Sequence, residues 1–244
     1  MNARHEITQS AASALSVDQA IGQIAVQLPG ATAVFRRLKL DFCCGGQISL
    51  KQAAADKGLD AQAVLAELAA LQRTDALPGL TEPAALIDHI LTRYHEVHRA
   101  QLPELIRMAR RVEAVHRDAP MVPTGLAELL EGMEQELLSH MEKEETILFP
   151  ALKAGNYVVV TGPINVLRVE HTEHGALLDK VLALTQDATP PQGACNTWRA
   201  LYAGIAQFND DLINHIHLEN NVLFPQFETL TKVQEGGSSG CACG

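Results

Sequence analysis

Four stretches of this sequence carry apolar residues at alternating steps of three and four, a spacing that places them on one face of a helix. A proline stands where three of these helices are expected to begin, at Pro83, Pro123 and Pro163. Four long amphipathic helices predict an antiparallel four-helix bundle. Alternating runs rich in Val, Ile and Thr between hairpin turns do not occur, so the predicted fold class is all-α. The stretches are residues 83–116, 123–153, 163–186 and 195–229.

Histidines and glutamates interrupt the apolar stripe of these four helices. His89, His116, His217 and Glu145 fall off the stripe, and His217 is expected to face outward or to lie behind the inward-facing side chains. The stripes run through Leu91, His95, His98, Leu102 and Leu105; Leu126, Leu130, Met133, Leu137, His140, Glu144, Ile147 and Ala151; Ile164, Leu167, His171, His174, Leu178 and Val181; and Leu201, Ile205, Phe208, Leu212, His215, Glu219 and Val222.

These polar residues recur with a fixed period. SHMEKEETILFP at 139–150 and NHIHLENNVLFP at 214–225 share the frame H-x-x-x-E-x-x-x-L-F-P, 75 residues apart. YHEVH at 94–98 and EHTEH at 170–174 share H-x-x-H, 76 residues apart. The bundle is therefore predicted to be one two-helix unit used twice, with a pseudo-two-fold axis near the middle.

Two glutamates on a buried stripe predict a metal site, because an ionised carboxylate is very costly to bury unless a cation compensates it. Imidazole and carboxylate suit iron, zinc, manganese and copper. Four histidines and two glutamates are too many for one tetrahedral zinc. They suit two metal ions, with Glu144 and Glu219 bridging, two histidines on each ion, and an oxo or hydroxo group with an open position completing the shell.

The frames select His140 and His215 as two of the four histidines. The other two come from the H-x-x-H pairs, and spacing alone does not choose between their members. The candidates are His95 or His98, and His171 or His174.

Five segments are predicted along the chain. Short helices are expected in a small domain with adjacent cysteines, with Asp18, Ser49 and Asp60 as N-caps. The linker lies within RTDALPGLTEP, a turn-rich stretch. The segments are a tail at 1–15, the small helical domain at 16–75, the linker at 76–83, the bundle at 84–230 and a tail at 231–244.

Composition excludes several classes of partner. The chain has 244 residues, 47% of them apolar, and a net charge of −10 without a basic cluster, so neither nucleic acid nor a membrane surface is an expected partner. No apolar run is long enough to span a bilayer, and the polar N-terminus shows no secretory signal. Five cysteines, two adjacent and two at the very end, do not form a disulfide framework. A cytoplasmic location is expected.

Several of these segments resemble the repair-of-iron-centres (RIC) family, di-iron proteins with a hemerythrin-like domain. The resemblance covers residues 16–230 and implies that His95 and His171 complete the ligand set with His140, His215 and the bridging Glu144 and Glu219. It also implies two iron ions with a μ-oxo group. The segments are LDFCCGG at 40–46, RYHEVHRAQLPEL at 93–105, SHMEKEETILFP, VEHTEHGALL at 169–178 and HIHLENNVLFP.

The resemblance implies a function in repairing iron–sulfur clusters damaged by nitrosative or oxidative stress, through iron donation, nitric oxide handling, or both. Damaged iron–sulfur proteins are then the partners, with nitric oxide or dioxygen as small ligands. Such a protein is a repair factor more than a classical enzyme. The sequence leaves a homodimer open.

Cys43 and Cys44 are the other candidate site. The resemblance favours a redox-active or nitric-oxide-reactive pair, or a handle for a partner protein. The alternative is two thiols in a tight glycine-assisted turn. A disulfide between adjacent cysteines is strained and therefore labile. Cys195 is expected only to pack.

Three other functions compete with cluster repair. The first is a dioxygen-binding hemerythrin-type carrier or sensor, which typically uses an extra histidine and an asymmetric shell. The second is a di-iron oxidase, which tends to be richer in carboxylates. The third is an interaction bundle without metal.

Overall fold

The computed structural model describes residues 15–28, 30–71, 82–156 and 159–228. In these residues all regular structure is helical apart from an isolated bridge between Ala20 and Ser49, which confirms the all-α prediction. By their contacts these described residues form two compact units, one within 15–41 and 46–71 and the other within 42–45 and 82–228. The predicted tails, except Leu15, and nearly all of the predicted linker lie outside the described residues.

The first unit consists of α1 (Ile21–Gln27), α2 (Ala31–Arg37), α3 (Leu50–Asp56) and α4 (Ala61–Ala70). Ser49 caps α3 by accepting a hydrogen bond from the Gln52 backbone N–H, and Asp60 caps α4 in the same way. These two predicted caps are confirmed. Asp18 is wrong as a cap, because α1 begins at Ile21 and its N-cap residue is Ala20.

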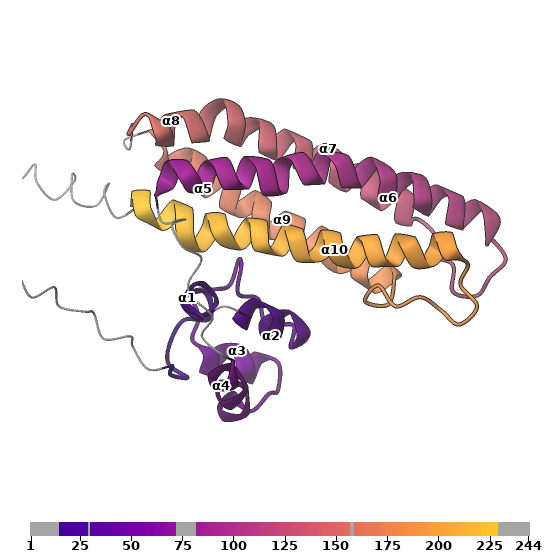
Figure 1. The fold of residues 1–244 in the computed structure, drawn as a ribbon, viewed down its shortest axis with the longest axis horizontal. Coiled ribbons are helices and arrows are strands. Elements are labelled where there is room, and N and C mark those ends of the chain that lie inside the picture. Colours follow the sequence, from indigo (N-terminus) through magenta and orange to yellow (C-terminus); the bar gives the residue numbers. More distant parts are fainter. Residues whose placement is uncertain (1–14, 29, 72–81, 157–158, 229–244) are drawn as a thin grey trace, which may run out of the picture. The chain divides into compact units, whose positions relative to one another are not determined.

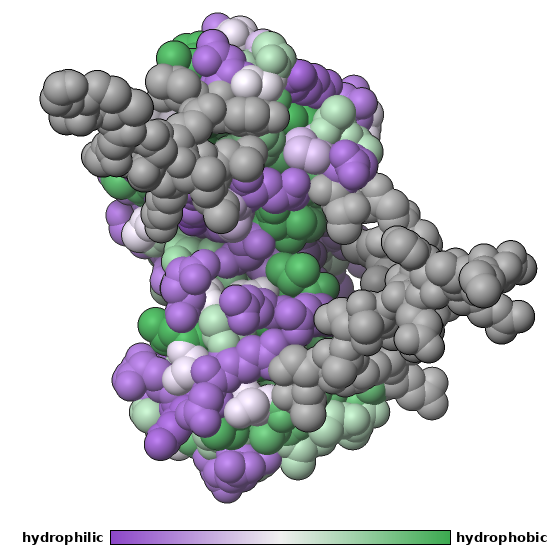
Figure 2. All heavy atoms as spheres, turned by 90° about the vertical axis from the view of Figure 1, so that its left-hand side faces the viewer, coloured by the Kyte–Doolittle hydropathy of each residue, from purple (hydrophilic) through white to green (hydrophobic). Residues whose placement is uncertain are grey.

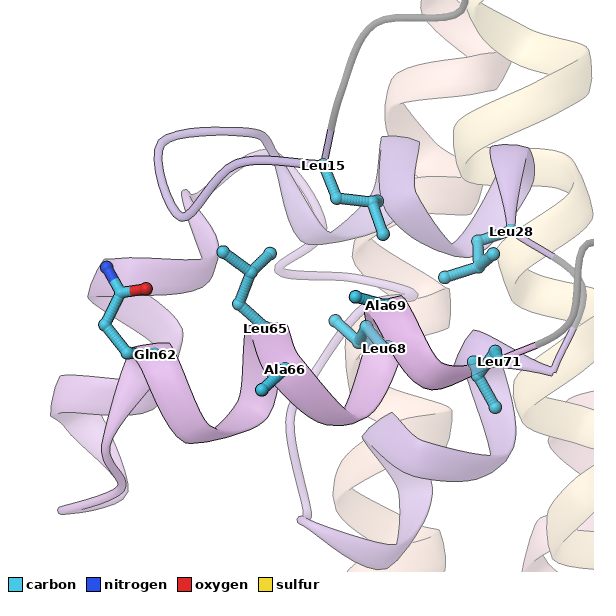
Figure 3. A pocket seen from close by; sticks show the side chains of 8 residues that line it. All are labelled: Leu15, Leu28, Gln62, Leu65, Ala66, Leu68, Ala69 and Leu71. Carbon is cyan, nitrogen blue, oxygen red and sulfur yellow. The ribbon is translucent and has the colours of Figure 1, made fainter.

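One hollow of the first unit lies beside α4 (Figure 3). Leucine and alanine side chains form most of its lining, and Gln62 is its polar member. None of the lining side chains titrates, so the hollow offers no acid, base or metal ligand. The lining residues are Leu15, Leu28, Gln62, Leu65, Ala66, Leu68, Ala69 and Leu71.

The second unit contains four long helical segments that run side by side (Figure 1). α6 packs against α7 and α10, and α9 packs against the same two helices, so α6 and α9 lie on opposite corners of the bundle. The segments are α5 (Pro83–Ile90), η1 (Leu91–His95) and α6 (Glu96–Val115); α7 (Leu126–Lys143), η2 (Glu144–Leu148) and α8 (Phe149–Lys153); α9 (Thr161–Leu184); and α10 (Asn196–Leu218) with η3 (Glu219–Leu223), which continues as helix to residue 228.

The four segments match the predicted spans to within a few residues at each end. Pro83 occupies the first turn of α5 as predicted. Pro123 and Pro163 are wrong as helix starts. Helix α7 begins three residues after Pro123, and its N-cap residue is Gly125 at φ 87°. Helix α9 begins two residues before Pro163.

Three π-helical turns shift the apolar stripe by one residue, which corrects part of the sequence prediction. Each π turn adds one residue to the local helical repeat. Ile147, expected inside, is 58% exposed, whereas Leu148 is 1% exposed. Val222 is likewise only half-buried while Leu223 is buried. Leu91 and Ala151 of the predicted stripe are also half-buried.

Two apolar clusters fill the bundle, and the histidines and glutamates of the stripes lie between them along each helix. One cluster includes Leu102, Leu130, Leu178 and Leu201. The other includes Leu86, Leu152, Ile164, Leu223 and Phe227 on the same four segments. The polar layer is therefore enclosed by packed hydrocarbon at both ends.

Exposed helix faces in the second unit still carry single apolar side chains. Val115, Val166 and Val169 are each more than half exposed. The face shown in Figure 2 mixes hydrophilic and hydrophobic residues, as is usual for amphipathic helices around a core. None of the described helices is long and apolar enough to cross a membrane.

Candidate metal centre

Six side chains predicted from the sequence as metal ligands meet in the polar layer. Each of them is at most 1% exposed. Three of them lie on π turns, with His95 ending η1, Glu144 opening η2 and Glu219 opening η3. π turns recur at functional sites because they re-aim a side chain from inside a long helix. The six are His95, His140, Glu144, His171, His215 and Glu219.

Each glutamate reaches both pairs of histidines. Glu144 places Oε2 3.3 Å from Nε2 of His95 and Oε1 3.4 Å from Nε2 of His140. Glu219 places Oε1 3.1 Å from Nε2 of His215 and Oε2 3.0 Å from Nε2 of His171. A carboxylate with one oxygen toward each of two donor pairs has the arrangement of a bridging ligand.

The histidines form two pairs through their Nε2 atoms. Those of His95 and His215 are 3.2 Å apart, and those of His140 and His171 are 3.1 Å apart. Together with the two glutamates, each pair offers four ligand atoms that lie within 4.8 Å of one another. We call these sets the His95–His215 half and the His140–His171 half.

Three of the four histidines donate from Nδ1 to an outer acceptor. His95 donates to Oε1 of Glu145 at 2.7 Å, and Arg99 pairs with the same carboxylate. His140 donates to Oε2 of Glu170 at 2.8 Å, and Glu170 also pairs with Lys143. Such hydrogen bonds orient the ring and leave Nε2 free for a metal.

His171, the third donor, and His215 differ from each other at Nδ1. His171 donates from Nδ1 to Oδ1 of Asn220 at 2.9 Å. Nδ1 of His215 has no hydrogen-bond partner among the described residues, and the ring of Tyr94 stacks parallel to the imidazole at 5.3 Å between centroids.

Both units of the chain match known protein families. Residues 86–227 match the model of the hemerythrin HHE cation-binding domain, and residues 17–72 match a domain of unknown function, DUF542. The chain is 51% identical to the iron–sulfur cluster repair protein YtfE of Citrobacter koseri over 86% of its length and 96% of that protein. The proteins of the same name from Dickeya chrysanthemi and Cronobacter sakazakii are 49% and 50% identical over the same shares.

The chain belongs to the iron–sulfur cluster repair family with a hemerythrin-like domain. The two matched domains correspond to the small helical unit and to the bundle that follows it. The description of the bundle domain names cation binding.

The buried carboxylates of this hemerythrin-like domain fit a cation chemically. Both oxygens of Glu144 and Oε2 of Glu219 are buried and receive no hydrogen bond. Burial and the mutual repulsion of the two groups favour protonation of Glu144. His140 and His95 nevertheless outweigh them and hold the pKa of Glu144 below its ordinary value. Burial opposes ionisation of Glu219 as well, yet His171, His140 and His95 lower its pKa. Both groups are thus anions, and three of their four oxygens have no hydrogen-bond donor among the described residues.

The histidines supply the compensating charge when no metal ion is bound. Burial lowers the pKa of His140, but the anionic Glu144 and Glu219 raise it to about 9. The pKa of His95 is raised for the same reason. Burial and the neighbouring His95 hold the pKa of His215 well below its ordinary value. A metal ion would displace the protons from His95 and His140 and take their place as the counter-charge.

The structure separates the members of the two H-x-x-H pairs. His95 and His171 face the carboxylates, whereas His98 and His174 lie behind them, against the rings of His215 and His140. Within the part of the chain that the structure describes, neither nitrogen of His98 nor Nδ1 of His174 has a hydrogen-bond partner. Burial and nearby histidines lower the pKa of His98 to about 2 and that of His174 to about 3.

One surface hollow of the bundle adjoins the His140–His171 half. His174 is one of its lining residues, and the lining also includes three carboxylates and one ammonium group. Its lining residues are Gln135, Glu136, Ser139, Lys143, Glu170, Glu173 and His174.

Cys43 and Cys44 form no disulfide, and their sulfur atoms lie 3.7 Å apart. The backbone carbonyl of Cys43, which groups with the second unit, accepts hydrogen bonds from the side-chain amides of Asn220 and Asn221 at 3.3 and 3.1 Å. The thiols are not among the six centre residues. Cys195 packs as expected, and Nε2 of His116 lies 3.2 Å from its sulfur.

His217 was expected either to face outward or to lie behind the inward-facing side chains, and the outward alternative is wrong. It is 4% exposed, its Nδ1 contacts the amide of Asn221 at 3.1 Å, and its ring meets that of Phe42 edge to face. His217 lies off the bundle seam, where a helix position is usually exposed, but here the loop at residues 42–45 covers it.

Sequence analysis missed the outer partners Glu145, Glu170 and Asn220. Their places in the repeat are the signal that could have found them. Glu145 and Asn220 each directly follow a glutamate of an H-x-x-x-E frame, and Glu170 directly precedes His171.

Proposed function

We propose that this chain is a non-haem di-iron protein that supports the repair of iron–sulfur clusters damaged by nitrosative or oxidative stress. One observation carries the proposal: two buried, donor-poor carboxylates each present one oxygen to each of two histidine pairs. Relatives that share about half of their residues with this chain are named iron–sulfur cluster repair proteins.

The six centre residues would hold two iron ions. His95 and His215 would bind one ion, His140 and His171 the other, and Glu144 and Glu219 would bridge them, with an oxo or hydroxo group completing the bridge. Imidazole and carboxylate ligands suit iron. Two ferric ions with two carboxylates and one oxo group come close to neutrality, which permits burial between apolar clusters.

Iron donation and nitric oxide binding are both consistent with this ligand set. Four protein ligands on each ion leave coordination positions open to nitric oxide or dioxygen. They also hold iron less completely than a saturated shell, so the iron itself can serve as cargo for a damaged iron–sulfur protein. The acidic hollow beside His140 gives a cation a favourable electrostatic environment at the surface.

The remaining expectations belong to the same proposal. Cys43 and Cys44 act as the redox-active or nitric-oxide-reactive pair, and the protein works in the cytoplasm. Whether it acts as a monomer or a homodimer does not affect the site, because all six centre residues come from one chain.

The proposal is tested by incubating protein loaded with ⁵⁷Fe with a nitrosylated iron–sulfur protein. We expect recovery of the cluster spectrum and transfer of ⁵⁷Fe into the recovered cluster, or transfer of nitric oxide to the di-iron protein. Recovery that is equally fast with metal-free protein contradicts the proposal. Stable, reversible dioxygen binding by the reduced protein without cluster recovery would instead indicate the oxygen-carrier alternative, which the names of the relatives do not favour.

A further inference from the structure

We infer that the two metal positions are unequal, that the His95–His215 half binds its ion more weakly, and that Tyr94 is the residue responsible. The inference rests on the proposed function, since it assigns which of the two ions is the exchangeable one. It follows from a place where the two-fold repeat of the bundle is broken.

The repeat pairs the outer residues of one half with those of the other. Glu145 and Asn220 are equivalent, because each directly follows a bridging glutamate and accepts the Nδ1 proton of the histidine opposite. Tyr94 and Glu170 are also equivalent, because each directly precedes the first histidine of an H-x-x-H pair.

The equivalent residues do different things. Glu170 accepts the hydrogen bond from Nδ1 of His140. Tyr94 places the face of its ring against His215, with the two planes 4° apart, and accepts nothing from Nδ1. The imidazole of His98 lies 5.4 Å from that of His215 between centroids, and neither of its nitrogens makes a hydrogen bond to a described residue.

The missing acceptor matters because of the proton on the ring. A neutral imidazole that binds a metal through Nε2 must carry its proton on Nδ1. In His95, His140 and His171 that proton has an acceptor. In His215 metal binding leaves a buried N–H without a protein partner, which is unfavourable. In the metal-free chain His215 avoids this, because its proton can reside on Nε2, 3.1 Å from Oε1 of Glu219.

Loss of one outer partner typically lowers metal affinity about ten- to a hundredfold. With one equivalent of metal, we therefore expect the ion in the His140–His171 half. The second equivalent enters the His95–His215 half and is the one given up first to a competing ligand.

Equilibrium titration with Co²⁺ against a competing chelator tests the assignment. Repulsion between two close cations separates the two binding constants in any case, so the variants decide. Tyr94→Glu places a carboxylate at the position equivalent to Glu170. The guanidinium of Arg93, 5.0 Å from the ring centre of Tyr94, is the nearby cation for this carboxylate. We expect about tenfold tighter binding in the weaker step only. Tyr94→Phe keeps the stacked ring and should change neither step.

A second pair of variants tests the other half. Asn220→Ala removes the acceptor of His171 and should weaken the tighter step about tenfold. Asn221→Ala is its matched control, because Asn221 donates to the same Cys43 carbonyl but contacts none of the six centre residues. The assignment is overturned if Asn221→Ala weakens binding of the first, tightly bound ion. It is also overturned if Asn220→Ala weakens binding of the second, weakly bound ion instead.

Anomalous diffraction from wild-type crystals with one equivalent of Co²⁺ gives a test that needs no variant. The peak should lie between His140 and His171. A peak between His95 and His215, or equal peaks in both halves, overturns the inference while leaving the di-iron proposal intact. Absence of any Co²⁺ or iron binding would instead remove the proposed function.

Discussion

Glu145 accepts a hydrogen bond of 2.7 Å from Nδ1 of His95, and this bond joins two helical segments of the bundle. The carboxylate also pairs with Arg99 at 2.8 Å, and the side chain of His95 is fully buried. This relationship orients Nε2 of His95 toward Glu144 and thereby links a half-buried surface residue to the candidate centre.

Removal of this acceptor should weaken metal binding without unfolding the bundle. For Glu145→Ala we expect a loss of about ten- to a hundredfold in the affinity of the His95–His215 half, because the ring loses its orienting partner. Competition titration with a chelator measures the loss. Arg99→Ala, which removes only the ion-pair partner of Glu145, should have a smaller effect. Equal effects of the two variants would contradict the role given to Glu145.

The proposed bridging role of the two shared carboxylates predicts a spectroscopic change. In Glu144→Leu or Glu219→Leu we expect the metal content to fall from about two ions to one or fewer, and the oxo-to-iron charge-transfer absorption to disappear. Each substitution takes one ligand from both halves. Glu142→Leu, on the exposed face of the same helix, should keep both properties. An unchanged spectrum in Glu144→Leu would remove the bridging assignment.

The thiol pair should be separable from the metal centre. We expect the double variant Cys43→Ser with Cys44→Ser to keep its iron, because neither sulfur belongs to the six-residue set, but to repair clusters less well in cells exposed to nitric oxide. Iron content and recovery of a cluster-dependent enzyme are the measurements. Cys195→Ser serves as the control for loss of a thiol elsewhere. Loss of iron in the double variant would tie the cysteines to the metal.

The π turn at 144–148 predicts an order of stabilities that a regular α-helix would reverse. Leu148→Ala should lower the free energy of unfolding by about 2–5 kcal/mol, because it empties a position that is 1% exposed. Ile147→Ala should change it by about 0.5 kcal/mol or less, because that side chain is 58% exposed. Urea unfolding of the metal-free protein gives both values. A larger loss for Ile147→Ala would place the π turn elsewhere.

Buried neutral histidines should make stability depend on pH. Burial, with His140 and His171 nearby, lowers the pKa of His174 from 6.5 to about 3. Below pH 6.5 the unfolded chain therefore binds a proton that the folded chain does not, and stability falls as the pH drops toward 3. The contribution of this group is about 1.4 kcal/mol for each pH unit in that window.

His174→Ala isolates this term from the other titrating groups. Its cavity lowers stability at every pH, but the difference from wild type should shrink between pH 6 and pH 5 as the wild-type protein loses stability faster. Urea unfolding of both metal-free proteins at several pH values measures the difference. A difference that stays constant would mean that His174 is protonated in the folded protein.

Much of the centre could be predicted because its chemistry is periodic. Two H-x-x-x-E frames on apolar stripes, at the same depth in two helices, require His140, Glu144, His215 and Glu219 to meet inside a bundle. The H-x-x-H pairs do not decide which histidine of each pair is the ligand, because both members of each pair lie on the stripe. Apolar spacing alone does not choose His95 over His98, and the π turn that ends at His95 leaves no signal in that spacing.

The order of residues in this chain was sufficient to determine four amphipathic helices, a two-fold repeat and a buried set of imidazoles and carboxylates, because helix periodicity assigns each residue a face. The tertiary structure alone decided which nitrogen meets which acceptor. Glu145, Glu170 and Asn220 come from helical segments other than those of the histidines they orient, and Tyr94 leaves His215 without such a partner. Contacts between helices depend on their packing and on local register, which the periodicity of a single helix does not contain.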